Sequence, residues 1–285
     1  MTSRTTDRAA TYFFWGTGFL IMIILFWFLY RILGDGLHML SWNFITGKPS
    51  EIQAGGGVGP MVFNSFYILF LSLLFSLPIG LGAGVYLSIY AKQNKFTDIV
   101  RISVEALSSV PSIVFGLFGF LLFVNWMGLK FSILGGAATL ALLNLPVLVR
   151  VTEESIRAVP ESYWEASLAL GSTRWQAIAR VLLPAALPSL ITGITLVAGR
   201  ALGESAILIY TAGLSVSRFF PDLNPLSMGE TLAVHLWYVQ SEAIVPDAKD
   251  IAKGSAALLL IIVLIFNLLI GIPSRMLSKK LSGGK

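Results

Sequence analysis

An arginine and a glutamate stand four residues apart in one of the most apolar parts of the chain. Arg200 follows an uncharged run of nineteen residues, Val181 to Gly199, and Glu204 comes about one helical turn later. A charge at the centre of a membrane span costs about 2.5 to 3.5 kcal/mol, so neither side chain is expected to face lipid. The Arg200 guanidinium can offer two parallel N–H donors to two oxygens of an oxyanion. We expect Arg200 to meet an anion on a membrane pathway and Glu204 to hold the guanidinium; an ion pair that only fixes helix register is the alternative.

Other candidate residues carry weaker signals. Arg150, at the inner end of another uncharged run, is a second candidate cation on the pathway, and a plain cytoplasmic-side anchor explains it equally well. His235 lies in an apolar segment, Leu226 to Gln240, which is too short to span and which we interpret as an outer gate or docking surface. A lone histidine there is expected to be a hydrogen-bonded packing residue rather than a ligand.

The motifs of catalysis are absent from the sequence. It contains no phosphate-binding loop, no Ser/His/Asp set and no His-Glu-x-x-His, and we expect no enzyme activity and no bound cofactor. Zero cysteines exclude disulfides and thiolate metal sites. Any nucleotide hydrolysis coupled to this protein must therefore take place on another polypeptide.

The loop between the fourth and fifth apolar runs, residues 151–183, has the pattern of two short helices. Pro160 suits a first helical turn, Ser162 with Glu165 matches a capping box, and Gly171 stands where a helix would end. Thr173 with Gln176 starts a second helix, which Pro184 is expected to close. Such a pair cannot bury both its faces, so Trp164, Leu168 and Trp175 must be covered by the rest of the chain or by a partner.

The composition indicates that the apolar runs and the loop between them belong to a membrane protein. Of the 285 residues, 55% are apolar and only 12% are charged, which excludes a soluble enzyme, a coiled coil, a disordered chain and a nucleic-acid-binding domain. About 20 apolar residues cross a bilayer as a helix. We predict an all-α polytopic membrane protein in a single domain, 1–285, with six spans at about 12–33, 61–91, 106–127, 131–150, 181–209 and 254–274.

The distribution of basic residues predicts the orientation of the spans. With the N-terminus inside, thirteen Lys and Arg fall in inner segments and six in outer ones, which places both termini in the cytoplasm. Gly80 with Gly84, and Gly199 with Gly203, have the spacing that lets helices approach closely. The outer connection Ser50 to Pro60 is glycine-rich and is expected to be a flexible loop.

The cytoplasmic loop resembles a known signature. Glu165-Ala166-Ser167, three residues, Gly171, nine residues and Val181-Leu-Leu-Pro184 are similar to the EAA motif of bacterial ABC-importer permeases, E-A-A, three residues, G, nine residues and I-x-L-P. Ser167 and Val181 are the departures. The resemblance implies that this loop forms coupling helices that dock on a cytoplasmic ATPase, and that Glu165, Ala166, Ser167 and Gly171 belong to that contact.

Other stretches resemble one branch of that family, the phosphate-uptake permeases. The stretches are Arg200-Ala-Leu-Gly-Glu-Ser, Ser109-Val-Pro-Ser-Ile-Val-Phe-Gly116, Thr231-Leu-Ala-Val-His-Leu-Trp-Tyr238, and a last span with Asn267, and they look like the PstA-type subunit. The resemblance implies the MetI-like fold with a peripheral first span, in the bacterial inner membrane. It also implies three partners: a PstC-type permease, a dimer of PstB-type ATPases and an external PstS-type phosphate-binding protein. An importer of phosphonate, sulfate or molybdate, or a stand-alone anion transporter, is the alternative.

Overall fold

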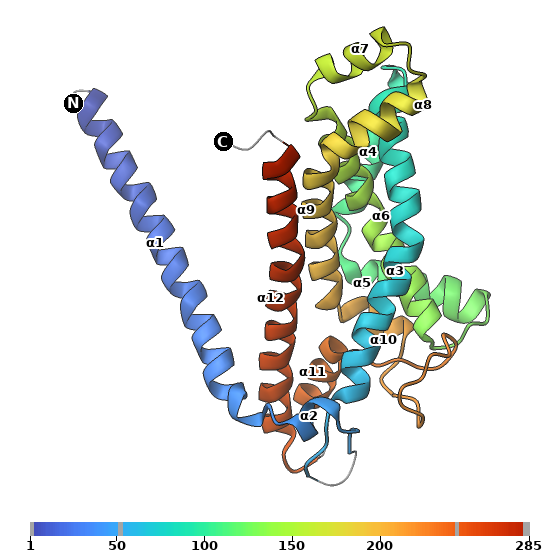
Figure 1. The fold of residues 1–285 in the computed structure, drawn as a ribbon. Coiled ribbons are helices and arrows are strands. Elements are labelled where there is room, and N and C mark those ends of the chain that lie inside the picture. Colours follow the sequence, from blue (N-terminus) through green and yellow to red (C-terminus); the bar gives the residue numbers. More distant parts are fainter. Residues whose placement is uncertain (1–2, 51–53, 243–244, 282–285) are drawn as a thin grey trace.

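The computed structural model describes residues 3–50, 54–242 and 245–281, and this part of the chain is almost entirely helical (Figure 1). The α-helices are α1 (Ser3–Gly36), α2 (Trp42–Thr46), α3 (Gly59–Val85), α4 (Lys95–Ser108), α5 (Ser112–Gly119), α6 (Ile133–Arg157), α7 (Glu161–Ala169), α8 (Arg174–Ala177), α9 (Leu183–Leu202), α10 (Ala206–Thr211), α11 (Leu232–Ser241) and α12 (Ala248–Leu281). Wider π turns extend α3, α5 and α8, at Tyr86–Tyr90, Phe120–Trp126 and Ile178–Leu182. Within the described residues the only β contact is a single bridge between Val216 and Gly229.

Five helical stretches are long and apolar enough to cross a membrane, and a bent pair supplies a sixth candidate. The pair joins α4 to α5 and its π extension at an angle of 95°. The predicted third span, 106–127, therefore does not form one straight helix. Pro111 has no N–H to donate to the preceding turn, and α4 ends at Ser108, just before it.

Close packing of α3 on α6 forms the centre of the bundle. A side chain at Gly80 would collide with Leu148, and one at Gly84 would collide with Thr152, so both glycines permit the approach predicted for them. On α9, Gly199 abuts Asn267 of α12, whereas Gly203 has no neighbour beyond its own helix. Within the described residues the predicted close approach is therefore found at Gly199, and at Gly203, where α9 ends, it stays a prediction.

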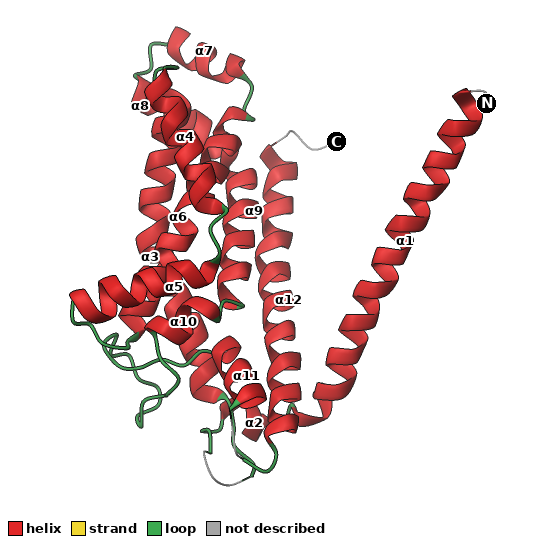
Figure 2. Ribbon diagram, turned by 180° about the vertical axis from the view of Figure 1, so that it is seen from behind, coloured by secondary structure: helices red, strands yellow, loops and turns green. Residues whose placement is uncertain are grey.

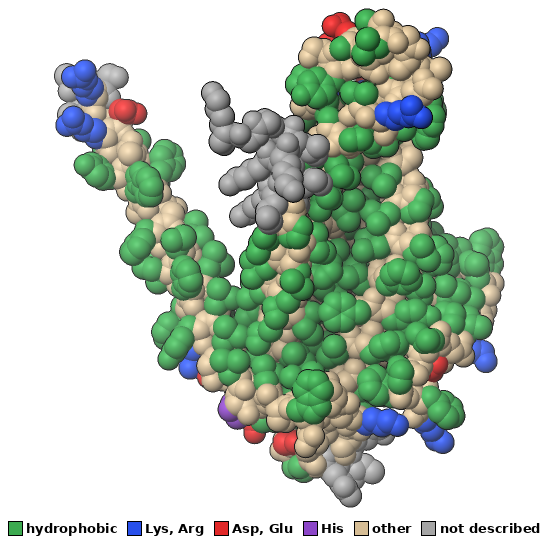
Figure 3. Space-filling view, in the orientation of Figure 1, with side chains coloured by type: hydrophobic (Ala, Val, Ile, Leu, Met, Phe, Trp, Pro, Cys, Tyr) green, Lys and Arg blue, Asp and Glu red, His purple; other side chains and the backbone are tan. Residues whose placement is uncertain are grey.

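Different helices and loops lie at the two ends of the molecule. The start of α1, the last turns of α12 and the α7–α8 loop lie at one end, and α2 and α11 lie at the other (Figures 1 and 2). On the face in Figure 3, charged side chains gather at the two ends and apolar side chains cover the middle. This arrangement is that of a protein with its middle in a bilayer.

The first helix lies apart from the others. None of the residues in the apolar window of α1 is buried, and in Figure 2 only its end near α2 reaches the bundle. There Gly36 packs against Lys253 and Ala257 of α12. The first span is thus peripheral, as the resemblance implied.

The glycine-rich outer connection is packed rather than loose. Residues 51–53 lie outside the described residues, but Gly56 to Pro60 are buried. A side chain at Gly57 would meet Gly47, and one at Gly59 would meet Thr46. Where it is described, the connection is therefore held by close backbone contacts, contrary to the prediction of a flexible loop.

Candidate functional site

The projecting loop between α6 and α9 consists of two short helices with a tight corner. Gly171 has a φ of +82°, a conformation that side-chain-bearing residues rarely adopt. Thr173 accepts from the Gln176 N–H at 3.3 Å while Gln176 Oε1 accepts from the Thr173 N–H at 2.9 Å, which confirms the second capping box. The first capping box is wrong: α7 begins at Glu161, so Ser162 already lies within the helix and makes no cap.

The four residues predicted to contact an ATPase fall into two groups. Glu165, Ala166 and Gly171 are exposed. Ser167 is 7% exposed, and its hydroxyl lies 2.7 Å from that of Ser172, so this side chain ties the corner together from inside. Ala166, Ser167 and Gly171 line a hollow of about 730 Å³ between the two helices.

Apolar side chains of the loop are covered unequally. Trp164 packs against the buried cluster that contains Ile178 and Leu182, so the bundle covers it. Trp175 remains 65% exposed, Leu170 90% and Leu168 37%. Large apolar side chains left in solvent at the tip of a membrane protein mark a surface for a partner.

Pro184 does not close the second helix as predicted. A continuous helical stretch runs from Arg174 to Leu202. The π turn Ile178–Leu182 comes directly before Pro184, which then occupies the first turn of α9, where a missing N–H is tolerated. The loop is therefore joined to α9 without a break.

Arg200 lies in the last turn of α9, within membrane depth. Its neighbour Gly199 contacts Asn267, which is inside the uncharged stretch Gly254 to Ser274 of α12. Arg200 is exposed and has neither a hydrogen bond nor an ion pair with any part of the chain that the structure describes. The guanidinium therefore faces away from the packed core of this chain.

The expected pairing of Arg200 with Glu204 is wrong. The helix ends at Leu202, with Gly203 as its C-cap, so Glu204 does not continue the face that carries Arg200. The Glu204 N–H donates to the carbonyl of Ala201 at 3.3 Å, which turns the chain away from the helix axis before α10. Arg200 stands in the last turn of α9, where the partly negative end of a helix favours a basic side chain.

Arg150 is exposed and takes part in an ion-pair network at the inner part of α6. It donates to Glu154 at 2.8 Å and to Glu105 of α4 at 3.3 Å. This geometry favours the anchor over the pathway cation.

Next to it, the buried Glu153 accepts from Arg101 at 2.8 Å and pairs with Arg157 at 2.9 Å. This network is not predicted by the sequence, in which its only signal is that charged residues stand at the ends of apolar runs.

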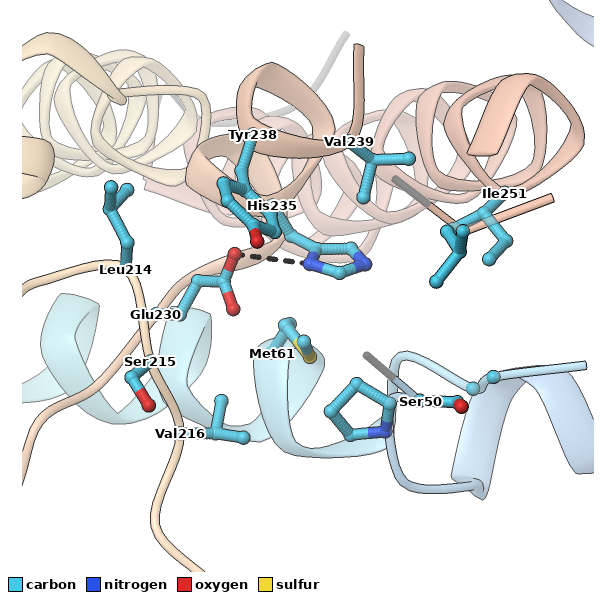
Figure 4. Close-up of a pocket in the computed structure, with 14 residues that line it drawn as sticks. Ser50, Met61, Leu214, Ser215, Val216, Glu230, His235, Tyr238, Val239 and Ile251 are labelled. Atoms are coloured by element: carbon cyan, nitrogen blue, oxygen red, sulfur yellow. Dashed lines mark hydrogen bonds and ion pairs between the residues drawn. The ribbon is translucent and has the colours of Figure 1, made fainter. Parts of the chain in front are cut away.

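A small cavity of about 70 Å³ lies at the α2–α11 end of the molecule, between α3, α11 and α12 (Figure 4). His235 is 6% exposed, and its Nδ1 lies 3.0 Å from Glu230 Oε1. The prediction that His235 is a hydrogen-bonded packing residue is confirmed. The Glu230 carbonyl in turn accepts from Asn64 of α3 at 3.1 Å, so the pair holds the outer segments together.

The outer loop before α11 is ordered by its own polar side chains. Asp222 accepts from the Asn224 N–H at 2.9 Å, and Asn224 accepts from the Leu226 N–H at 3.1 Å. Hydrogen bonds from Ser217, from the Asn224 backbone and from Ser227 hold the pKa of Asp222 below its ordinary value. This stabilisation is present above the ordinary pKa of an aspartate and is lost as the pH falls through the lowered one.

Residues 76–283 match a family model described as binding-protein-dependent transport system inner membrane component. The chain belongs to this family. It is 47% identical over 292 residues, with 99% of both chains covered, to the probable ABC transporter permease protein YqgI of Bacillus subtilis (strain 168). It is 34% identical over 244 residues to the phosphate transport system permease protein PstA of Haemophilus influenzae, with 85% of this chain and 84% of the relative covered.

The fold agrees with that membership. The structure of the MetNI methionine ABC transporter, in an inward-facing conformation, matches with a TM-score of 0.61 at 23% identity. The match covers 76% of this chain and 94% of the other. The protein is thus a MetI-like permease subunit of an ABC importer, an integral membrane protein of the inner-membrane type.

Proposed function

We propose that this permease subunit carries inorganic phosphate, as the PstA-type half of a phosphate importer. The observation that carries the proposal is the 34% identity to the phosphate transport system permease protein PstA over 85% of the chain. The chemistry of Arg200 supports it, because a guanidinium within membrane depth that pairs with no described residue of its own chain suits a multivalent oxyanion.

The proposed assembly has four kinds of subunit. A PstC-type permease completes the pathway, two PstB-type ATPases dock on the α7–α8 loop, and a PstS-type protein delivers phosphate at the α2–α11 end. The α7–α8 end then lies in the cytoplasm with both termini. ATP and Mg²⁺ bind the ATPases, and this chain catalyses no reaction itself.

The proposed mechanism is alternating access. ATP-driven closure of the ATPases moves the α7–α8 loop, and the continuous helix from Arg174 to Leu202 passes this movement to Arg200. Phosphate bound near Arg200 is then exposed to one side of the membrane at a time. Because no described residue of this chain is a fixed counter-ion for Arg200, the guanidinium is free to exchange water for phosphate oxygens.

Reconstitution of the four-component complex in proteoliposomes tests the proposal. ATP should drive uptake of radiolabelled phosphate only when the binding protein is present. Uptake of sulfate, phosphonate or molybdate in place of phosphate would reassign the substrate within the oxyanions, which Arg200 alone does not distinguish. Uptake without an ATPase would instead support a stand-alone transporter.

A further inference from the structure

The exposed faces of the membrane-spanning helices do not all have the same chemistry. On α12 the exposed side chains include Leu268 at 58%, Leu269 at 67% and Ile272 at 55%. On α3 they include Phe70 at 62% and Ile79 at 58%. Side chains of this kind suit contact with acyl chains.

The exposed face of α9 is different. Ser189, Thr192, Leu196 and Arg200 are all exposed and follow one another at spacings of three or four residues, which places them on one face of the helix. Ser189 accepts a hydrogen bond from Ser155 at 2.9 Å, and Thr192 donates to the carbonyl of Pro188 at 2.9 Å. A membrane helix does not present an arginine and two hydroxyls to lipid, so this face borders water or another subunit.

One large apolar side chain interrupts this polar face. Leu196 is 67% exposed, and it stands one helical turn, about 6 Å along the axis, from both Arg200 and Thr192. Along α9, Ser189 and Thr192 precede Leu196 on the side of the α7–α8 loop, and Arg200 follows it. A ring of apolar side chains between two polar regions can close a pathway by excluding water.

We propose that Leu196 is the apolar gate of the pathway and that Ser189 and Thr192 line its inner half. This inference rests on the proposed function, since it takes Arg200 to be on the pathway. In the closed state Leu196, together with apolar side chains of the second permease, keeps the anion at Arg200 out of contact with the cytoplasm. In the open state the Ser189 hydroxyl donates a hydrogen bond to the departing anion, and the Thr192 hydroxyl does so after it rotates away from the carbonyl of Pro188.

Thiol labelling tests whether this face meets water. The chain has no cysteine, so a single introduced thiol is the only one in it. In the complex with cysteine-free partners, Thr192→Cys should react with a charged methanethiosulfonate at least ten times faster than Leu269→Cys. Equal rates for the two variants would overturn the proposal.

Anion leak tests the gate itself. Without ATP, vesicles with Leu196→Ser should lose phosphate and sulfate about ten times faster than wild type, because a hydroxyl no longer excludes water. Leu269→Ser is the matched control, with the same 67% exposure, and should not leak. If Leu196→Ser does not assemble, Leu196→Ala takes its place with the same expected direction.

The outcomes separate the gate from the proposed function. A wild-type complex that imports phosphate, combined with gate variants that do not leak, overturns the gate alone. A wild-type complex that does not import phosphate, combined with gate variants that leak anions, overturns the substrate and leaves the gate supported.

Discussion

Arg200 has a large desolvation cost and no counter-ion among the described residues to offset it. Placing a charge at the centre of a membrane span costs about 2.5 to 3.5 kcal/mol. The favourable interaction of a cation with a helix C-terminus offsets only about 0.3 to 1 kcal/mol of that cost. The remainder must come from water, from a group on another subunit or from a bound anion. The proposed function assigns it to the bound anion.

Replacement of Arg200 tests this explanation. Arg200→Gln should lower ATP-driven phosphate uptake by roughly ten- to hundred-fold, since a hydrogen bond to a charged group contributes about 1.5 to 3 kcal/mol. Arg200→Lys should retain part of the uptake, because it keeps the charge and loses the paired donors.

Glu204→Gln serves as the control for Arg200. Because Glu204 makes no ion pair with Arg200, its neutral variant should change uptake less than Arg200→Gln does. Normal uptake by the Arg200→Gln complex would remove the residue from the pathway. Both measurements require that the variants assemble with their partners in normal yield.

At the scale of elements, α4 is held to α6 by charges that face inward. Arg101 reaches Glu153 at 2.8 Å and the carbonyl of Leu87 at 3.1 Å, so one guanidinium joins three segments. The opposite side of α4 exposes Phe96, Ile99 and Ile102. The ion pairs therefore fix the bent helix that the sequence alone did not predict.

Removal of Arg101 should destabilise the protein. Arg101→Ala leaves the carboxylate of Glu153 buried with only Arg157, and we expect a loss of about 1 to 3 kcal/mol. Thermal unfolding in detergent measures the loss. Arg31→Ala, which breaks an exposed pair with Asp35, should cost less than about 1 kcal/mol. Equal shifts in the two variants would contradict the buried network.

The α7–α8 corner offers a second prediction at this scale. Thr173→Ala removes a confirmed cap and should lower the free energy of local unfolding of α8 by about 1 kcal/mol. Amide hydrogen exchange in α8 should therefore become about five-fold faster. Ser162→Ala removes a hydroxyl that caps nothing and should leave exchange in α7 unchanged. Hydrogen exchange followed by mass spectrometry compares the two, and a larger effect at Ser162 would refute the assignment of the caps.

For the whole molecule, the α7–α8 loop is the part that projects farthest at its end of the bundle (Figure 1). The exposed Leu170 lines the hollow together with Ala166 and Gly171, and Trp175 is exposed on the same loop. A rigid corner with apolar side chains in solvent is suited to fit a groove on another protein. The loop is joined to α9 by continuous helix, so a force on it reaches the level of Arg200.

Charge reversal on the loop tests the docking of an ATPase. Glu165→Lys should abolish stable association with the ATPase while the permease remains inserted, because repulsion replaces attraction at a contact. Glu242→Lys, at the opposite end of the molecule, is the control and should co-purify normally. Normal recovery of the ATPase with Glu165→Lys would count against the coupling role.

The sequence by itself determined what depends on local composition and spacing. Uncharged runs of membrane length predicted a polytopic helical protein, since the bilayer requires backbone groups to pair within each span. Thr173 and Gln176 predicted a helix cap, and Gly171 predicted a corner. Both are local features, because the capping hydrogen bonds and the turn involve residues only a few positions apart. The spacing from Glu165 to Pro184 indicated the permease family.

The tertiary structure alone decided which distant residues meet. Arg200 and Glu204 are four apart, yet the helix ends between them, and Glu204 turns away. Arg101 and Glu153 are 52 residues apart in the sequence, yet the Arg101 Nε–H donates a hydrogen bond to Glu153 Oε1 at 2.8 Å. Ion pairs and helix ends depend on packing between segments. The packing energy depends on residues that are distant in the sequence, and a local sequence pattern does not show which of them are in contact. For that reason the sequence predicted the spans, and only the fold showed which charges have partners.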